Sequence, residues 1–94
     1  MTNNQHARLR IPARAAEVTG GDRQDSYGPV KMNLQRIADL WTAYLDREVV
    51  ITAEDAAWMM VLLKMARSGA DGYHEDNYVD AAAYAAIAGE CRKP

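Results

Sequence analysis

Two acidic and two basic side chains have types and spacings suited to chemistry. Asp76 and Asp80 are four residues apart, and Lys64 and Arg67 are three apart. Such spacings place side chains on one face of a helix. Two carboxylates on one face can hold Mg²⁺ together with phosphate oxygens of a substrate, and a nearby lysine meets a phosphate as a point charge. The pattern therefore predicts metal ligands at Asp76 and Asp80 and phosphate contacts at Lys64 and Arg67.

The same four side chains also have a structural interpretation. A turn around Gly72 separates the basic pair from the acidic pair, so antiparallel packing of the flanking helices would bring the pairs face to face. Lys64 or Arg67 would then neutralise Asp80 inside an apolar interface, where an unpaired charge is costly. The two interpretations are compatible, because an empty site often rests as a network of ion pairs.

A second candidate site is the glycine-containing segment 20–29, which reads GGDRQDSYGP. Glycine allows positive φ and close approach of the backbone to a ligand. Tyr27, in this segment, and Asn33, one turn into the helix that follows, are therefore candidate ligand contacts. The alternative is a structured turn in which Tyr27 packs on the core and Asn33 holds the segment in place.

The elements that must position these groups are helices. The sequence has one short β-branched run, 49–51, which is too short to make a sheet. A first helix is predicted over 12–19, because proline is tolerated in a first turn and glycine ends a helix. A second is predicted over 30–46, where apolar residues recur with helical periodicity on one side at Val30, Leu34, Ile37, Trp41, Tyr44 and Leu45.

The third predicted helix has clear signals at both ends. Thr52 is a suitable N-cap and Asp55 stands three residues later as its capping-box partner. The helix continues to Ser68 and stops at Gly69. A fourth helix is predicted from Asp76 or Asn77 to about Arg92. We therefore predict an all-α fold, a small bundle of about four helices.

The third and fourth helices are apolar around almost their whole circumference. Such helices must be buried on all sides, and a bundle of four helices in one chain has no layer deep enough to surround both. We therefore predict that oligomerisation completes the bundle, as a homodimer or a higher homo-oligomer.

Composition limits the remaining classes of protein. The chain has 94 residues, of which 49% are hydrophobic, which suits one folded domain over 11–94 after a flexible tail over 1–10. It has no apolar run long enough to span a membrane and no signal core. The net charge of −2 argues against a nucleic-acid binder that works by bulk electrostatics, although Arg8, Arg10 and Arg14 are basic. A single cysteine suits the reducing cytoplasm.

Four segments together resemble a family of small uncharacterised proteins found in phages and prophages. The segments are DRQDSYGPVKMN (22–33), RIADLWTAYL (36–45), TAEDAAWMMVLLKMAR (52–67) and DNYVDAAAYAA (76–86). The resemblance covers roughly residues 20–90. It implies a phage or prophage origin, and hence the cytoplasm of a bacterial host, but it implies no activity.

The segment 77–84 is also similar to a motif of the MazG-like all-α nucleotide pyrophosphohydrolases. These helical oligomers hold Mg²⁺ on E-x-x-E and E-x-x-D motifs and cleave nucleoside triphosphates. Asp80 matches the aspartate of the second motif, whereas Asn77 replaces its glutamate, with Asp76 adjacent. The first motif is poorly matched, because Trp58 and Met59 stand where its second glutamate is expected.

Two functions from different classes follow. The first is Mg²⁺-dependent binding of a nucleotide, or its pyrophosphohydrolysis, at Asp76, Asp80, Lys64 and Arg67. The second is a non-enzymatic oligomeric helical module that binds a host or phage partner or sequesters a small ligand. The sequence leaves the ligand, any protein partner and the number of subunits open.

Overall fold

The computed structural model describes residues 6–20, 30–70 and 72–92, and these form four α-helices and no strand. The helices are α1 (Ala7–Gly20), α3 (Val30–Tyr44), α4 (Ala53–Ser68) and α5 (Glu75–Arg92). The prediction of an all-α bundle is confirmed. None of the described helices is both long and apolar enough to cross a membrane.

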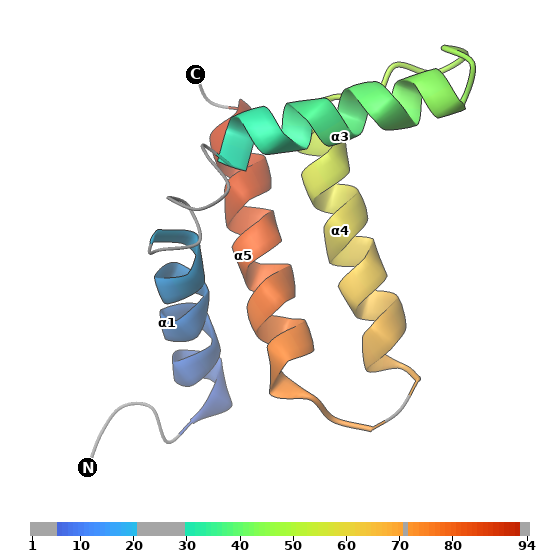
Figure 1. Ribbon diagram of the computed structural model, residues 1–94. Helices are drawn as coiled ribbons and strands as arrows, with labels where there is room; N and C mark the ends of the chain where they lie inside the picture. Colours follow the sequence, from blue (N-terminus) through green and yellow to red (C-terminus); the bar gives the residue numbers. More distant parts are fainter. Residues whose placement is uncertain (1–5, 21–29, 71, 93–94) are drawn as a thin grey trace.

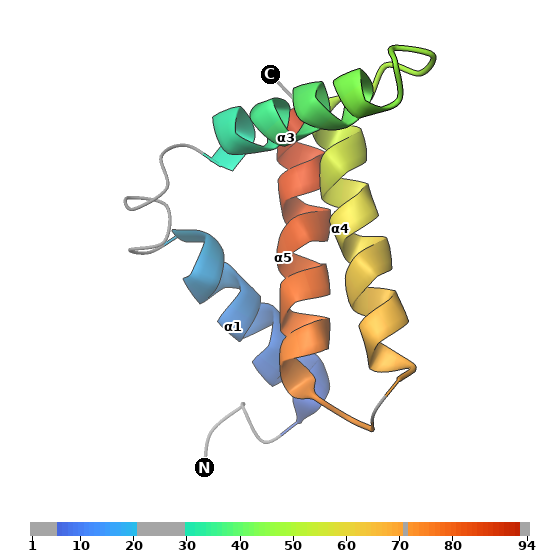
Figure 2. The ribbon, with the colours of Figure 1, turned by 45° about the vertical axis from the view of Figure 1, so that its right-hand side comes forward.

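Helix α5 lies at the centre of the molecule. It has α1 along one side and α4 along the other, while α3 lies across the ends of α4 and α5 (Figure 1 and Figure 2). Among the described helices, α1 contacts α5 alone. Alanine has the highest helix propensity, and its small side chain lets neighbouring helices approach closely. The alanine content of α5 therefore suits a helix that has neighbours on several sides.

Helix α1 begins at Ala7, five residues before the predicted start. Its first turn is closed by the carbonyl of His6, which accepts from the amides of Leu9 and Arg10 at 2.9 Å each. Residues 7–10 thus belong to the helix and not to the predicted tail, whereas residues 1–5 lie outside the described part. Pro12 stands inside the helix, where it removes one backbone hydrogen bond.

Helix α3 ends at Tyr44, two residues before the predicted end at Asp46. Asp46 and Arg47 follow with φ of 59° and 64°, in the left-handed region that stops a helix. The amide of Arg47 donates to the carbonyl of Thr42 at 2.9 Å. The Thr42 hydroxyl in turn accepts from the amide of Ile51 at 2.8 Å, which ties the connection back onto α3 and leads the chain into α4.

The predicted capping box of α4 is confirmed. The Thr52 hydroxyl accepts from the Asp55 amide at 3.0 Å, and the Asp55 carboxylate accepts from the Thr52 amide at 3.1 Å. The helix ends at Ser68, before Gly69, as predicted.

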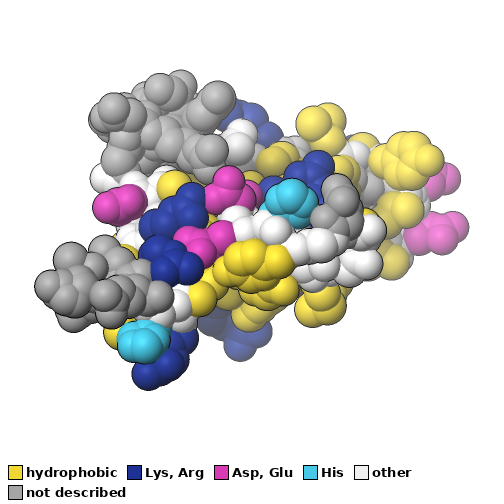
Figure 3. All heavy atoms as spheres, turned by 90° about the horizontal axis from the view of Figure 1, so that it is seen from below, with side chains coloured by type: hydrophobic (Ala, Val, Ile, Leu, Met, Phe, Trp, Pro, Cys, Tyr) yellow, Lys and Arg dark blue, Asp and Glu magenta, His cyan; other side chains and the backbone are white. Residues whose placement is uncertain are grey.

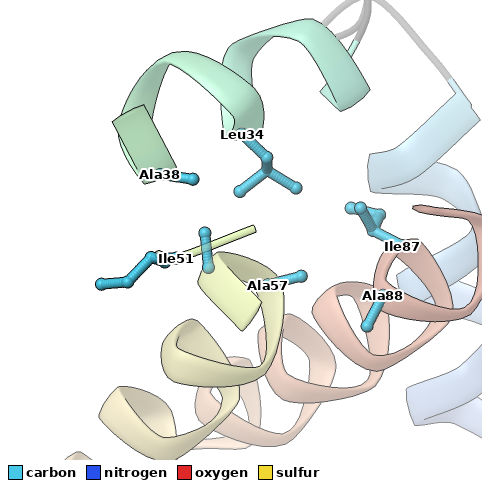
Figure 4. Packing of buried hydrophobic residues seen from close by; sticks show 7 residues of the cluster. Leu34, Ala38, Ile51, Ala57, Ile87 and Ala88 are labelled. Atoms are coloured by element: carbon cyan, nitrogen blue, oxygen red, sulfur yellow. The ribbon is translucent and has the colours of Figure 1, made fainter. Parts of the chain in front are cut away.

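The core is small and is made mostly of small side chains. Its main cluster joins α3, the residue before the α4 cap, α4 and α5 (Figure 4) through Leu34, Ala38, Ile51, Ala56, Ala57, Ile87 and Ala88. A second cluster joins α1 to α5 through Ala15, Val79 and Ala83. Leu34 and Val79 are the largest side chains that are fully buried among the described residues. Much of the apolar surface of the chain therefore lies outside the core.

Candidate functional site

Lys64 and Asp80 form an ion pair between α4 and α5. The Lys64 ammonium lies 3.0 Å from the carboxylate of Asp80, and their side chains are 14% and 30% exposed. Antiparallel packing of the two helices therefore brings these groups together, as the structural interpretation predicts. The Lys64 ammonium lies in the interface between α4 and α5 and is largely removed from water. A charge without hydration is costly unless it is paired, so the Asp80 carboxylate is needed there.

Asp76 is paired with a different helix. Its carboxylate lies 2.5 Å from the Arg14 guanidinium of α1, and its own side chain is 75% exposed. Asp76 and Asp80 thus occupy one helix but are each neutralised by a cation from another helix, Arg14 in one case and Lys64 in the other. The predicted face-to-face meeting of the acidic and basic pairs holds for Asp80 and does not hold for Asp76.

Glu75 is the centre of a charged network between α1 and α5. Arg10 donates from Nε to both carboxylate oxygens at 3.0 and 2.9 Å and from Nη2 to Oε1 at 2.6 Å. Arg14 donates to Oε2 at 2.7 Å, and the Tyr73 hydroxyl lies 3.4 Å from Oε1. Hydrogen bonds from Arg10, and then from Arg14, lower the pKa of Glu75 from its ordinary 4.5 to about 2. Basic and acidic side chains accordingly lie side by side at the end of the molecule where α5 begins (Figure 3).

Sequence reasoning missed this network. Arg10 and Arg14 stand four residues apart, which is the signal of one helical face. Starting the first helix at Pro12 left Arg10 in the predicted tail and hid that signal. The acidic partner, Glu75, is 65 residues from Arg10, and no local pattern identifies a contact across that separation.

None of the other predicted site residues has an ion pair with Asp80 among the described residues. Arg67 is exposed, and no ion pair joins it to Asp76 or Asp80. Asn33 is half-buried in α3, the helix that lies across the far ends of α4 and α5. Tyr27 lies outside the described residues.

The described residues do not fit a magnesium site well. No group of three or more His, Cys, Asp and Glu side chains in the described ranges is placed to hold a metal ion. Mg²⁺ is held by carboxylates that keep their negative charge free for it, whereas Asp76 and Asp80 already face Arg14 and Lys64. Magnesium at this position stays a prediction.

A hollow of about 540 Å³ lies where the start of α4 meets α3 and the end of α5. Lys31, Gln35, Glu54, Cys91 and Arg92 are among its lining residues. The carboxylate of Glu54, which lines the hollow, already has hydrogen-bond partners. It accepts hydrogen bonds from Arg92 at 2.9 and 3.2 Å and from the Trp58 indole at 3.1 Å. Burial raises the pKa of the Cys91 thiol, which disfavours the reactive thiolate. The hollow therefore shows no arrangement suited to catalysis.

The side of α4 that faces away from α5 carries a run of large apolar side chains. They are between 39% and 61% exposed, and we name them the α4 outer face: Trp58, Met59, Leu62, Leu63 and Met65. The fully buried residues of this helix are Ala56 and Ala57. Helix α4 thus buries small side chains and exposes large ones, the reverse of what a helix in a monomeric bundle does.

A second set of exposed apolar side chains lies near the N-terminal end of α4. The C-terminal half of α3 extends beyond α4 (Figure 1 and Figure 2), and the connection that follows lies with it. This surface, the α3 shelf, has exposed fractions from 43% to 87% and consists of Leu40, Tyr44, Leu45, Val49 and Val50. Contiguous apolar surface of several hundred Å² on a small protein marks a site of interaction.

The chain matches one protein family and two proteins of phages. Residues 10–92 match the family described as "Domain of unknown function (DUF6378)". The chain is similar to the Gene 55 protein of Mycobacterium phage L5, with 45% identity over 86 residues that make up 92% of this chain and 54% of that protein. It is also similar to the Gene 55 protein of Mycobacterium phage D29, with 39% identity over 75 residues, 80% of this chain and 48% of that protein.

The chain spans about half the length of these phage relatives. No solved structure matches it, and the likeness to a MazG-like enzyme stays a prediction. The match over residues 10–92 covers all four described helices except the first turn of α1. The chain therefore belongs to the DUF6378 family.

Proposed function

We propose that this chain is a non-enzymatic helical association module of a phage protein. The observation that carries the proposal is the α4 outer face, where five large apolar side chains of one helix are exposed while Ala56 and Ala57 are buried. Water contact with such a surface is unfavourable by about 25 cal/mol per Å². A protein partner on this face would remove that cost.

The charged groups support the same proposal over catalysis. The acids that would hold a metal each have a cation from another helix within 3.0 Å. A catalytic acid or base needs its charge available to the substrate, whereas these charges join α5 to α1 and to α4. Their geometry is that of groups that fix the arrangement of helices.

The chain covers 54% and 48% of the length of the two phage relatives, which suits a module that joins further parts of an assembly. We place this module in the cytoplasm of a bacterial host, where the free thiol of Cys91 would stay reduced.

Site-specific photo-cross-linking in cells tests the proposal. A photoreactive side chain replaces Leu62, 58% exposed at the middle of the α4 outer face, in bacteria that produce the full chain. The matched control replaces Met32, which is 55% exposed on α3 but belongs to neither apolar surface. Covalent protein adducts are expected from position 62 and not from position 32. Equal adducts at both positions, or none at position 62, would contradict an association role for this face.

Calorimetric titration distinguishes the module from the MazG-like alternative. A nucleoside triphosphate added with Mg²⁺ to the purified chain should give no heat of binding. Saturable heat that Asp80→Ala abolishes and Leu62→Glu preserves would instead establish the nucleotide function and overturn the module.

A further inference from the structure

We infer that the partner of the α4 outer face is a second copy of this chain, packed antiparallel about a two-fold axis near Leu62. The inference rests on the proposed function and names its partner. Three properties of the described residues carry it: the order of side chains along the face, the charge at its N-terminal end, and the area that it exposes.

The order of side chains is self-complementary. Identical antiparallel helices related by a two-fold axis at Leu62 place Trp58 of one copy opposite Ala66 of the other, and Met59 opposite Met65. A large side chain thus meets a small one, and flexible methionines, which fill irregular gaps, meet each other. Both copies use the same surface, so the contact closes after two chains.

The charges favour the antiparallel direction. The exposed Asp55 stands at the N-terminal end of the outer face, whereas Arg67 lies on the Lys64 side of α4. The antiparallel pair keeps the two Asp55 carboxylates about 20 Å apart along the axis. A parallel pair would place like charges side by side and would align the two helix dipoles unfavourably.

The exposed area is sufficient for a stable dimer. With about 200 Å² for a fully exposed large side chain, the α4 outer face leaves about 500 Å² exposed and the α3 shelf about 650 Å². A standard interface buries about 800 Å² on each partner. The shelf projects at the N-terminal end of α4, which in the antiparallel pair is where the C-terminal end of the second α4 lies. Each shelf would therefore cover the end of the other copy's α4.

Light scattering on the purified full chain tests the dimer. At 100 µM the mass is expected to be twice the 10.4 kDa of the chain. Leu62→Glu, and independently Met65→Glu, should halve that mass while the helical circular dichroism signal stays unchanged, because both side chains are exposed in the single chain. Met32→Glu is the matched control and should leave the dimer intact.

Cysteine cross-linking tests the direction of the pair. In a Cys91→Ser background, a mixture of Asp55→Cys and Gly69→Cys chains should join through a short thiol cross-linker, whereas Asp55→Cys chains alone should not. Position 69 accepts a side chain, because an added Cβ would come no closer than 3.8 Å to the Ala66 carbonyl oxygen. Cross-linking of Asp55→Cys chains to each other would overturn the antiparallel arrangement.

The outcomes separate this inference from the proposed function. A 10.4 kDa monomer at 100 µM, or a dimer that both glutamate variants leave intact, would overturn the second copy as partner. If the chain is monomeric while position 62 forms adducts with another protein in cells, the association module stands and only the identity of its partner is wrong.

Discussion

At the scale of single residues, Lys64 and Asp80 show how a charge can look catalytic in sequence and serve packing in the structure. Their 3.0 Å contact crosses the α4–α5 interface, and Lys64 is 14% exposed. A charged lysine in such an interface costs little folding free energy while its acidic neighbour is present. Removing that neighbour leaves a poorly hydrated ammonium without its counter-charge.

Asp80→Ala should therefore lower the free energy of unfolding by about 1–3 kcal/mol, measured by urea denaturation. Asp39→Ala is the control, since Asp39 is exposed and accepts one hydrogen bond from Gln35 within its own helix. Replacing both partners, Lys64→Met with Asp80→Leu, should restore most of the loss. An unchanged stability in Asp80→Ala would favour the site interpretation over the ion pair.

Glu75 makes the free energy of unfolding depend on pH in the acidic range. Its pKa is about 2 in the folded chain against an ordinary 4.5, so the folded state favours the ionised form. The stabilisation is complete above about pH 4.5 and is lost as the pH falls towards 2. Glu75→Gln should thus be less stable than the natural chain at pH 7, and the difference should shrink to near zero at pH 2. A difference that stays constant over this range would contradict the network.

Arg47 holds a left-handed backbone conformation without being glycine, at φ 64°. Glycine adopts this conformation without the steric cost that a Cβ brings. Arg47→Gly should stabilise the chain by about 0.5–1 kcal/mol, visible as a higher midpoint of thermal unfolding. Arg47→Ala keeps the Cβ and should give no such gain, so a similar gain in both variants would assign the effect to the lost charge instead.

At the scale of elements, α1 differs from the other helices because it touches α5 alone among the described helices. Its apolar contact is narrow, with Ala15 buried and Ile11 and Val18 partly buried against Val79 and Ala83. The charged network around Glu75 supplies the rest of the attachment. An element held by one neighbour and by partly exposed ion pairs opens more easily than the rest of the fold.

Replacing both arginines, Arg10→Gln with Arg14→Gln, should speed amide hydrogen exchange in α1 by about tenfold or more. Exchange in α4 and α5 should change little, because their contact does not use these groups. Hydrogen-exchange mass spectrometry resolves the segments. Equal acceleration in all helices would mean that α1 is an integral part of one cooperative unit.

Local signals of the elements were predictable from sequence, and contacts between distant elements were not. Thr52 and Asp55 form a capping box within four residues, and the pattern alone identified the start of α4. The pairing of Arg10 with Glu75 spans 65 residues and has no such local signature. For the candidate site, spacing identified Asp80 opposite Lys64 but could not place Asp76, because the position of α1 decides its partner.

At the scale of the whole molecule, the excess of apolar surface predicted for two helices falls on one of them. Helix α5 is apolar around most of its circumference and contacts three other described helices, which bury Val79, Ala83, Ile87 and Ala88. Helix α4 has α5 on one side and α3 at its start, and its outer face stays exposed. A helical wheel shows how much of a helix is apolar, but it does not show how many neighbours the fold supplies.

The stability of the whole molecule should therefore depend on its concentration. If a second copy covers the α4 outer face, mass action stabilises the folded state as the protein becomes more concentrated. Between 2 and 200 µM the midpoint of thermal unfolding should rise by about 5–10 °C, measured by circular dichroism. Leu62→Glu should show a midpoint independent of concentration. A constant midpoint in the natural chain would argue against the pair.

The lone attachment of α1 to α5 has a consequence for synthesis on the ribosome. Arg10 is translated 65 residues before Glu75, and at 5–20 residues per second that interval is about 3–13 s. Throughout it, α1 has no described helix to pack on, because α5, its one neighbour among the described helices, is the last of these to be made. The N-terminal helix therefore joins the fold only once α5 has been made, after α3 and α4 are already available.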